Sequence, residues 1–158
     1  MTRDPDLATA IDGMRQLNRA AADALVGAGV RTATDVTGFG LLGHGLEMAR
    51  AARVGFTFDA AALPALPGAL EVAAAGVETG GAAHNRRFVA ASLDVAAGVR
   101  PELVALAHDP QTSGGLLAAI APDRVSAVAD GLNQAGVEHW WIGTVEDAAS
   151  AGGSVALR

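Results

Sequence analysis

The chain has 158 residues, 51% hydrophobic and 18% charged, which fills one core and excludes a disordered tail or a collagen-like polymer. Its 17 acidic and 11 basic residues give a formal net charge of -6, so it lacks the basic surface that binds nucleic acid. All the basic residues are Arg, and the absence of Lys and Cys excludes a catalytic thiolate or Schiff base within this chain. With no Cys for disulfides, no export signal and no long apolar run, we expect one domain over residues 1–158 in the cytoplasm, with no nucleic-acid or membrane partner.

The first half of the chain predicts helices interrupted by two short strands. An apolar residue recurs every three or four positions from 5 to 17, which predicts a helix with one apolar stripe. The β-branched stretch VRTATDV predicts a strand that runs into the glycine turn TGFGLLGHG. The elements expected up to residue 75 are helices at 5–17, 19–28, 41–53 and 67–75, and strands at 30–36 and 54–58.

The second half predicts a long surface loop at 76–100, with a short helix or strand inside it, because these residues are the least periodic. Trp140 and Trp141 are expected in a strand, with one ring in the core and the other covering an interface or a helix. The other elements expected are helices at 101–107 and 122–135, strands at 116–120 and 137–145, and a weak edge strand at 154–157. Helices and strands mix without strict βαβ alternation, which favours an α+β layered fold.

A carboxylate, a hydroxyl and two glycines lie together in DVTGFG, residues 35–40, between a predicted strand and a predicted helix. Carboxylate oxygens suit Mg²⁺, and glycines at a helix N-terminus let backbone N–H groups approach a phosphate. The alternative is that Asp35 caps the helix and the glycines serve only the turn. From the local pattern alone, the capping alternative is favoured.

A second polar loop, DPQTSGG at 109–115, offers a carboxylate, an amide, two hydroxyls and two glycines before a predicted strand. It is either a turn whose side chains satisfy the local backbone or part of a polar cleft shared with residues 35–40. The segments 37–42 and 112–117 also share the pattern T-x-x-G-L-L, through a weak repeat or by chance.

Two further groups leave alternatives open. The segment 80–87, with two glycines, His84, Asn85 and two arginines, either binds an anion or a partner domain, or forms a solvated basic surface, which is favoured. His44 and Glu47 lie three residues apart on a predicted helix, where a solvent-facing pair is favoured over a metal site. The H-E-x-x-H, Rossmann and P-loop fingerprints are absent, which excludes those zinc, dinucleotide and nucleotide sites.

The segment DVTGFGLLGH at 35–44 resembles the signature of the selenophosphate synthetases, also called selenide, water dikinases. The likeness continues through MRQLNRAAADALVGAGVRTATDVTGFG, LPALPGALEVAAAG, GGAAHNRRF and LAHDPQTSGGLLAAI, from about residue 14 to residue 145. The pair DVTGFG and DPQTSGG is specific, because sister families that share the fold carry other residues after the Asp. Only the C-terminal domain of the family is resembled.

The resemblance implies a layered α+β domain of the aminoimidazole ribonucleotide synthetase C-terminal type, partly ferredoxin-like. It implies an enzyme that uses ATP and Mg²⁺ to convert selenide and water into selenophosphate, AMP and phosphate for selenocysteine biosynthesis. The family's catalytic Cys or selenocysteine, its catalytic Lys and most Mg²⁺ carboxylates lie in an N-terminal ATP-binding domain, so no catalytic residue is expected in this chain. That domain is the expected partner, in an enzyme expected to be a homodimer.

By position, the resemblance assigns Asp35 to a metal bound to ATP phosphates, and Thr37, Gly38 and Gly40 to the adjacent phosphate-facing turn. It assigns a second set to cleft lining or domain contact: Gly80, Gly81, Asn85, Asp109, Gln111, Thr112, Ser113, Gly114 and Gly115. The expected function is therefore that of half a dikinase, inactive alone. The alternative is a free-standing binding or regulatory module that keeps the fold without the chemistry.

Overall fold

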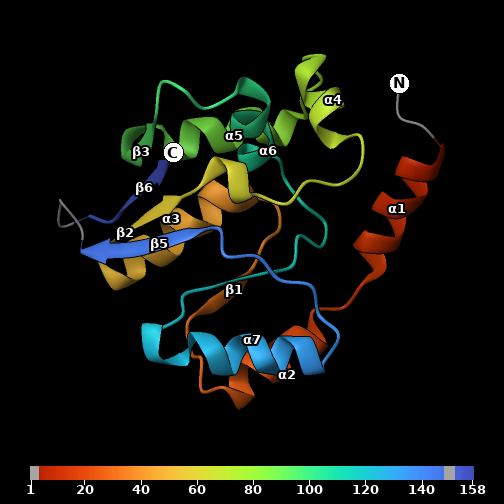
Figure 1. Ribbon diagram of the computed structural model, residues 1–158. Helices are drawn as coiled ribbons and strands as arrows, with labels where there is room; N and C mark the ends of the chain where they lie inside the picture. The colour runs from red at the N-terminus through yellow and green to blue at the C-terminus, as the bar shows by residue number, and fades with distance from the viewer. Residues whose placement is uncertain (1–3, 148–151) are drawn as a thin grey trace.

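The computed structural model describes residues 4–147 and 152–158 (Figure 1). The α-helices are α1 (Asp4–Arg15), α2 (Arg19–Gly27), α3 (Gly40–Ala52), α4 (Ala69–Ala74), α5 (Gly80–Val89), α6 (Pro101–His108) and α7 (Val125–Gln134). The strands are β1 (Ala33–Asp35), β2 (Val54–Phe58), β3 (Leu93–Val95), β4 (Leu116–Ala118), β5 (Gly143–Asp147) and β6 (Ser154–Leu157). Short 3-10 turns are η1 (Ala60–Ala62), η2 (Ala90–Ser92) and η3 (Pro122–Arg124). In these two ranges, no helix is long and apolar enough to cross a membrane.

The strands form two separate sheets (Figure 1). The larger sheet has the order β3-β6-β2-β5, in which β6 is parallel to both neighbours and β5 is antiparallel to β2. The smaller sheet pairs β1 with β4 antiparallel, and Asp35 lies opposite Leu116. Helices packed with a mixed sheet confirm the layered α+β class expected from the sequence.

The main core lies between α3 and the larger sheet. Leu42, Leu46 and Ala49 follow one another by four and three residues, so α3 presents all three on one stripe, where they are fully buried. Phe56 and Phe58 of β2 belong to the same buried cluster. Burial of each large apolar side chain contributes about 1.5–3 kcal/mol, so this stripe fixes α3 and the turn before it.

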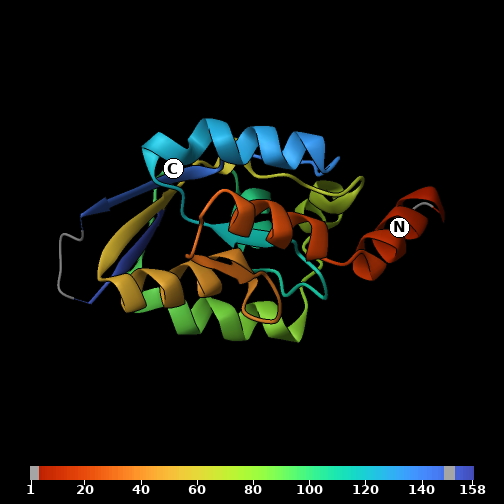
Figure 2. The same cartoon turned by 90° about the horizontal axis from the view of Figure 1, so that it is seen from below.

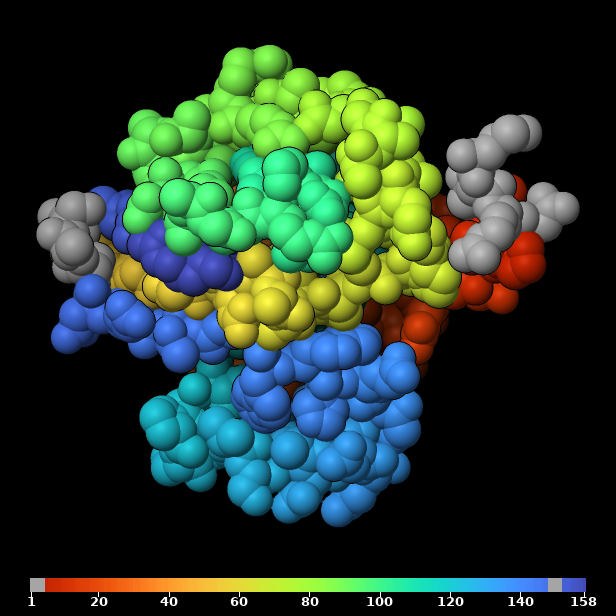
Figure 3. Space-filling view, turned by 45° about the horizontal axis from the view of Figure 1, so that its top comes forward, coloured from red at the N-terminus to blue at the C-terminus, as the bar shows by residue number. Residues whose placement is uncertain are grey.

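A smaller core joins α2 and α7, where Leu25 packs with Val128. Strand β4 contributes to both cores, because successive side chains of a strand point to opposite faces. Leu117 belongs to the main core, while Leu116 and Ala118 pack against the smaller one. The small sheet therefore links the two layers, which Figure 3 shows as an upper lobe and a lower lobe containing the blue atoms of α7.

Helix α1 forms where the apolar period predicts a helix, but its stripe is exposed. Leu7 is 51% exposed and Leu17, just beyond the helix, is 82% exposed. No α1 residue belongs to the two buried clusters of the described chain. Asp6 is buried against Gly68, and Figure 2 shows the rest of α1 extending from the body.

The segment 76–100 was expected to be a long surface loop with a short helix or strand inside it, but it contains more regular structure than that. Helix α5 and strand β3 occupy much of it. The Thr79 hydroxyl caps α5 by accepting a hydrogen bond from the Ala82 N–H, at 3.2 Å. Ala82, Asn85 and Val89 form the buried face, so one polar residue interrupts the apolar period that would have predicted the helix.

Two expectations about the last strands are also wrong. Residues 137–142 have no regular structure, and Trp140 and Trp141 are both about half exposed, so neither ring enters the core. Strand β6, expected at an edge, lies between β3 and β2 and buries Val155 and Leu157. Its neighbours are far away in sequence, so the local pattern cannot reveal that it is central.

Replacement of Leu157 by Ala tests the central position of β6. We expect Leu157→Ala to lower the free energy of unfolding by about 3 kcal/mol, because it leaves a cavity in the core. The matched change Leu7→Ala on exposed α1 should alter it by less than about 0.5 kcal/mol. Urea unfolding followed by circular dichroism measures both, and equal small losses would contradict a central β6.

Candidate functional site

The DVTGFG segment begins at the end of β1 and presents Asp35 at the surface. Asp35 is exposed, Val36 is buried, and Thr37, two residues beyond the end of β1, is half-buried. Among residues 4–147 and 152–158, nothing hydrogen-bonds or ion-pairs with the Asp35 carboxylate. The favoured alternative that Asp35 caps α3 is wrong, because Phe39 is the N-cap residue and no side chain caps it.

The two glycines of this turn have different surroundings. Gly40 has a φ of +66°, and a Cβ there would lie 2.9 Å from backbone atoms of His108 and Asp109. Conformation and packing both therefore require glycine at this position. Gly38 is exposed, and a Cβ there would meet nothing within 4 Å. Gly38 is thus the glycine open to a ligand, and contact between Gly40 and a phosphate stays a prediction.

Backbone hydrogen bonds join this turn to the second polar loop. The Val36 N–H donates to the Gly115 carbonyl at 3.0 Å, and the Gly114 N–H donates to the Val36 carbonyl at 2.9 Å. The Gln111 N–H donates to the Thr37 carbonyl at 3.0 Å. A Cβ on Gly114 would lie 2.8 Å from the Val36 oxygen, so the approach depends on glycine. The two loops that the sequence suggested as neighbours therefore lie side by side.

Asn85 connects α5 to both loops. Its side chain is 2% exposed, and its Nδ2 donates to the carbonyls of Gly38 at 2.9 Å and of His108 at 3.0 Å. Gly81, one turn earlier, packs against Pro110, which a Cβ would approach to 2.9 Å. The favoured solvated surface at 80–87 is therefore wrong for Asn85, which instead fastens the first loop to the end of α6.

The remaining residues of the predicted cleft set have separate places. Gly80 and Thr112 are exposed, and a Cβ on Gly80 would meet nothing within 4 Å. The Ser113 hydroxyl donates to the carbonyl of Gln16 at 3.0 Å. Ser113 therefore ties the second loop to the segment between α1 and α2.

The predicted solvent-facing position of His44 is wrong. His44 is 8% exposed, with Thr37 Oγ1 at 3.1 Å from its Nε2 and Glu47 Oε2 at 3.2 Å from its Nδ1. The ring of Phe39 lies against the imidazole, with centroids 5.6 Å apart. Side chains on a helix lean toward its N-terminus, so the place of His44 near the start of α3 was the available signal that it approaches Thr37.

Two titratable groups with shifted pKa values lie at the end of α6, the buried His108 and the half-buried Asp109. Burial raises the pKa of Asp109 above its ordinary value, while hydrogen bonds from Gln111 and Thr79 act in the opposite direction. Gln111 Nε2 donates to Asp109 Oδ2 at 3.0 Å. Burial lowers the pKa of His108, and its Nδ1 lies 2.7 Å from the Val104 carbonyl. A carbonyl can only accept, so this nitrogen of His108 carries a hydrogen.

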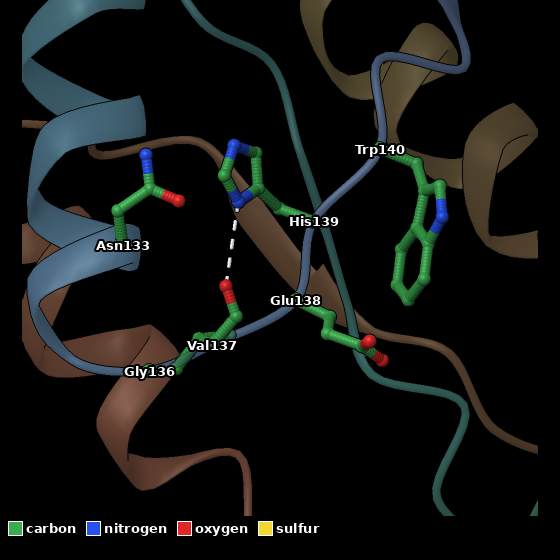
Figure 4. Close-up of a pocket in the computed structure, with 6 residues that line it drawn as sticks. All are labelled: Asn133, Gly136, Val137, Glu138, His139 and Trp140. Atoms are coloured by element: carbon green, nitrogen blue, oxygen red, sulfur yellow. Dashed lines mark hydrogen bonds between the residues drawn. The ribbon is translucent and has the colours of Figure 1, made fainter.

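A separate hollow lies at the end of α7 (Figure 4). Its lining residues are Asn133, Gly136, Val137, Glu138, His139 and Trp140. His139 Nδ1 lies 3.3 Å from the Val137 carbonyl, the interaction drawn as a dashed line. The lining includes no residue of the segments 35–40, 80–87 and 109–115, so the hollow is distinct from the loops around Asp35.

Around Asp35 the described residues offer only part of a metal site. Asp35 supplies a free carboxylate, which is an oxygen donor of the kind that Mg²⁺ prefers. Within the ranges that the structure describes, no three His, Asp or Glu side chains gather in a way that could hold an ion. Further ligands would have to come from water, a substrate or another part of a larger protein.

Comparison with known families identifies the fold. The family described as AIR synthase related protein, C-terminal domain, matches residues 4–155. This match covers nearly the whole sequence, and the chain belongs to that family.

Several curated proteins are similar to this chain. A selenide, water dikinase of Nitratidesulfovibrio vulgaris (strain DSM 19637 / Miyazaki F) is 42% identical over 143 residues, which are 90% of this chain and 41% of that protein. A selenide, water dikinase of Burkholderia orbicola (strain MC0-3) is 45% identical over 127 residues, 77% of this chain and 36% of that protein. One of Pseudomonas straminea is 42% identical over 118 residues, 75% of this chain and 33% of that protein.

These similarities confirm the resemblance seen in the sequence. The chain spans about two fifths or less of the length of these relatives.

The raised pKa of Asp109 predicts a pH-dependent effect of Asp109→Asn. The protonated carboxyl stabilises the fold below the unfolded-state pKa, and this contribution is lost as the pH rises through the folded-state pKa. Above the folded-state pKa the chain therefore carries a desolvated charge that Asn lacks. We expect Asp109→Asn to raise the melting temperature at pH 7, with a gain that shrinks as the pH falls.

Melting curves from pH 7 down to the acid limit of folding measure this gain, with Asp12→Asn on exposed α1 as the matched control. The control should show no comparable gain. A variant less stable than the parent at pH 7 would contradict the assignment, because it would mean that the ionised carboxylate stabilises the fold.

Proposed function

We propose that this chain is the C-terminal domain of an ATP-dependent selenide, water dikinase, which forms selenophosphate, AMP and phosphate from selenide, ATP and water. Its part is to supply one magnesium ligand and a phosphate-facing turn to a site shared with an ATP-binding domain. The identities of 42–45% with dikinases support the parent activity.

The observation that carries this proposal is the free carboxylate of Asp35 on a rigid support. An exposed carboxylate without a partner contributes nothing evident to folding, yet backbone bonds and Asn85 fix the loop beside it. In the described ranges, the N–H groups of Thr37, Gly38 and Phe39 also donate no hydrogen bond. A carboxylate beside free N–H groups suits a magnesium ion that bridges to phosphate oxygens.

Mg²⁺, when bound, would neutralise charge on the transferring phosphate and orient it. Asp35 would hold the ion, and the free N–H groups of the turn would bind phosphate oxygens. Gly38 leaves the backbone accessible, while Gly40 and Gly114 let the two loops approach each other. Asn85 keeps the Gly38 carbonyl turned inward, so that it does not repel the phosphate.

One carboxylate is too little for phosphoryl transfer, which needs several cations and positioned donors around the triphosphate. The chain has no Lys or Cys of its own. The remaining groups, including the nucleophilic Cys or selenocysteine, would therefore come from the ATP-binding domain.

The exposed stripe of α1 is a suitable surface for that domain. Leu7 and Leu17 present apolar area without a cover in the described chain, and Figure 2 shows α1 projecting at one edge. The bond from Ser113 to Gln16 links this surface to the second loop, so docking on α1 would place a partner near the site. A homodimer of the complete enzyme and its location in the cytoplasm belong to the same proposal.

The change Asp35→Asn tests this function in a complete enzyme, made by joining the chain to the remainder of the 42% identical Nitratidesulfovibrio vulgaris relative. We expect AMP formation to fall by about 100-fold or more, since a neutral amide is a poor magnesium ligand. The melting temperature should change little, because no described group contacts the carboxylate.

The matched control is Asp130→Asn, which removes the same charge from an exposed position on α7 and should leave turnover unchanged. AMP is measured by phosphorus NMR in the presence of selenide and Mg²⁺. Unchanged turnover and magnesium dependence in Asp35→Asn would contradict the proposed role.

A further inference from the structure

A chain of three polar side chains begins at Thr37, two residues after the proposed magnesium ligand. The Thr37 hydroxyl contacts His44 Nε2 at 3.1 Å, and His44 Nδ1 contacts Glu47 Oε2 at 3.2 Å. Thr37 lies in the turn, whereas His44 and Glu47 lie on α3. The imidazole is buried and the hydroxyl half-buried, while Glu47 is exposed. No step of the proposed function uses His44.

The partners of His44 restrict where its ring hydrogens can lie. An ionised carboxylate can only accept a hydrogen bond, so Nδ1 must be the donor to Glu47. In the neutral ring Nε2 then has a lone pair and accepts the Thr37 hydroxyl hydrogen. This hydrogen is directed toward α3, and the remaining lone pairs of Thr37 Oγ1 are directed away from the imidazole.

The orientation matters because Thr37 lies two residues after Asp35 in the same segment. A hydroxyl that pointed its hydrogen outward would repel a cation held by Asp35. A hydroxyl that has given its hydrogen to His44 instead offers oxygen to the cation or to its bound water. The ring of Phe39, centred 5.6 Å from the imidazole, helps to hold the ring in place.

We propose that His44, oriented by Glu47, is a positioning residue that turns the Thr37 hydroxyl so that its oxygen faces the magnesium ion. His44 touches neither the ion nor the phosphates and acts only through Thr37. This inference rests on the proposed function for the identity of the ion, but the hydrogen position is a property of this chain alone.

The first experiment measures the tautomer of His44 in the uniformly ¹⁵N-labelled chain, by long-range proton–nitrogen correlation of the imidazole rings. The chain has four histidines, and loss of one ring's signals in His44→Gln assigns His44. His108 is the internal reference, since its Nδ1 donates to the Val104 carbonyl. We expect a hydrogen on Nδ1 of His44 and none on Nε2. A hydrogen on Nε2 would overturn the inference.

The second experiment compares His44→Gln with His44→Asn in the complete enzyme. The amide oxygen of Gln can reach the place of Nε2 and accept from Thr37, whereas the shorter Asn reaches only the place of Nδ1. We expect His44→Asn to raise the magnesium concentration for half-maximal activity by about 10-fold, the usual scale for a group behind a ligand. His44→Gln should retain the parent value. Melting temperatures of the two variants identify any loss of folding.

Asp35→Asn in the same enzyme separates the two proposals. If Asp35→Asn is inactive and both His44 variants have the parent magnesium dependence, the inference about His44 is overturned and the proposed function stands. If Asp35→Asn is fully active, the proposed function fails, whatever the tautomer. Equal defects in His44→Gln and His44→Asn would also overturn the inference, because a restored acceptor must restore the magnesium dependence.

Discussion

The backbone hydrogen bonds between the loop at 35–40 and the loop at 109–115 are the constraint on which the rest of the structure depends. Val36 bonds in both directions to the Gly114-Gly115 pair, and the Thr37 carbonyl accepts from Gln111. These bonds extend the pairing of β1 with β4, which itself separates the two hydrophobic cores. A side chain at Gly114 would push the loops apart, so packing of the layers and shape of the site rest on the same close approach.

The residues of these two loops and of the segment 80–87 fall into two groups according to their contacts. The first group holds the loops together. Its members contact backbone groups of neighbouring loops: Asn85, Gly40, Gly114 and Gln111. The other group faces outward, with Asp35, Gly38 and Thr112 exposed. A motif residue is therefore as informative about assembly as about chemistry, and only its contacts distinguish the two. Asp35 is the clearest outward case, because no described group bonds to its carboxylate.

The sequence predicted local structure well where one period dominates. The strand 54–58 and the unit of strand, glycine turn and helix around DVTGFG form as expected, because alternation and helical spacing are local properties. The central place of β6 could not be predicted, since its partners β2 and β3 lie far away in the chain. The shared pattern T-x-x-G-L-L misleads for a related reason: its last three residues begin α3 in one copy and lead into β4 in the other.

The candidate site could likewise be predicted only in part. The residue types of the segments 35–40, 80–87 and 109–115 suggested metal and phosphate chemistry. The contacts between these segments could not be predicted, because they depend on the fold and not on any local pattern. The burial of His44 was missed because polar residues on amphipathic helices usually face water. The burial of Asn85 was missed because its segment was expected to be a surface loop. Both are buried here because each has hydrogen-bond partners to satisfy it, His44 with Thr37 and Glu47, and Asn85 with two backbone carbonyls.

The central claim is that this chain supplies one half of a shared site, and reconstitution tests it most directly. The chain and the separately produced remainder of a dikinase relative are assayed alone and mixed, with ATP, selenide and Mg²⁺, by phosphorus NMR. The account predicts no AMP above background from either part and AMP formation from the mixture. Turnover by this chain alone, or full turnover by the remainder without it, would contradict the account.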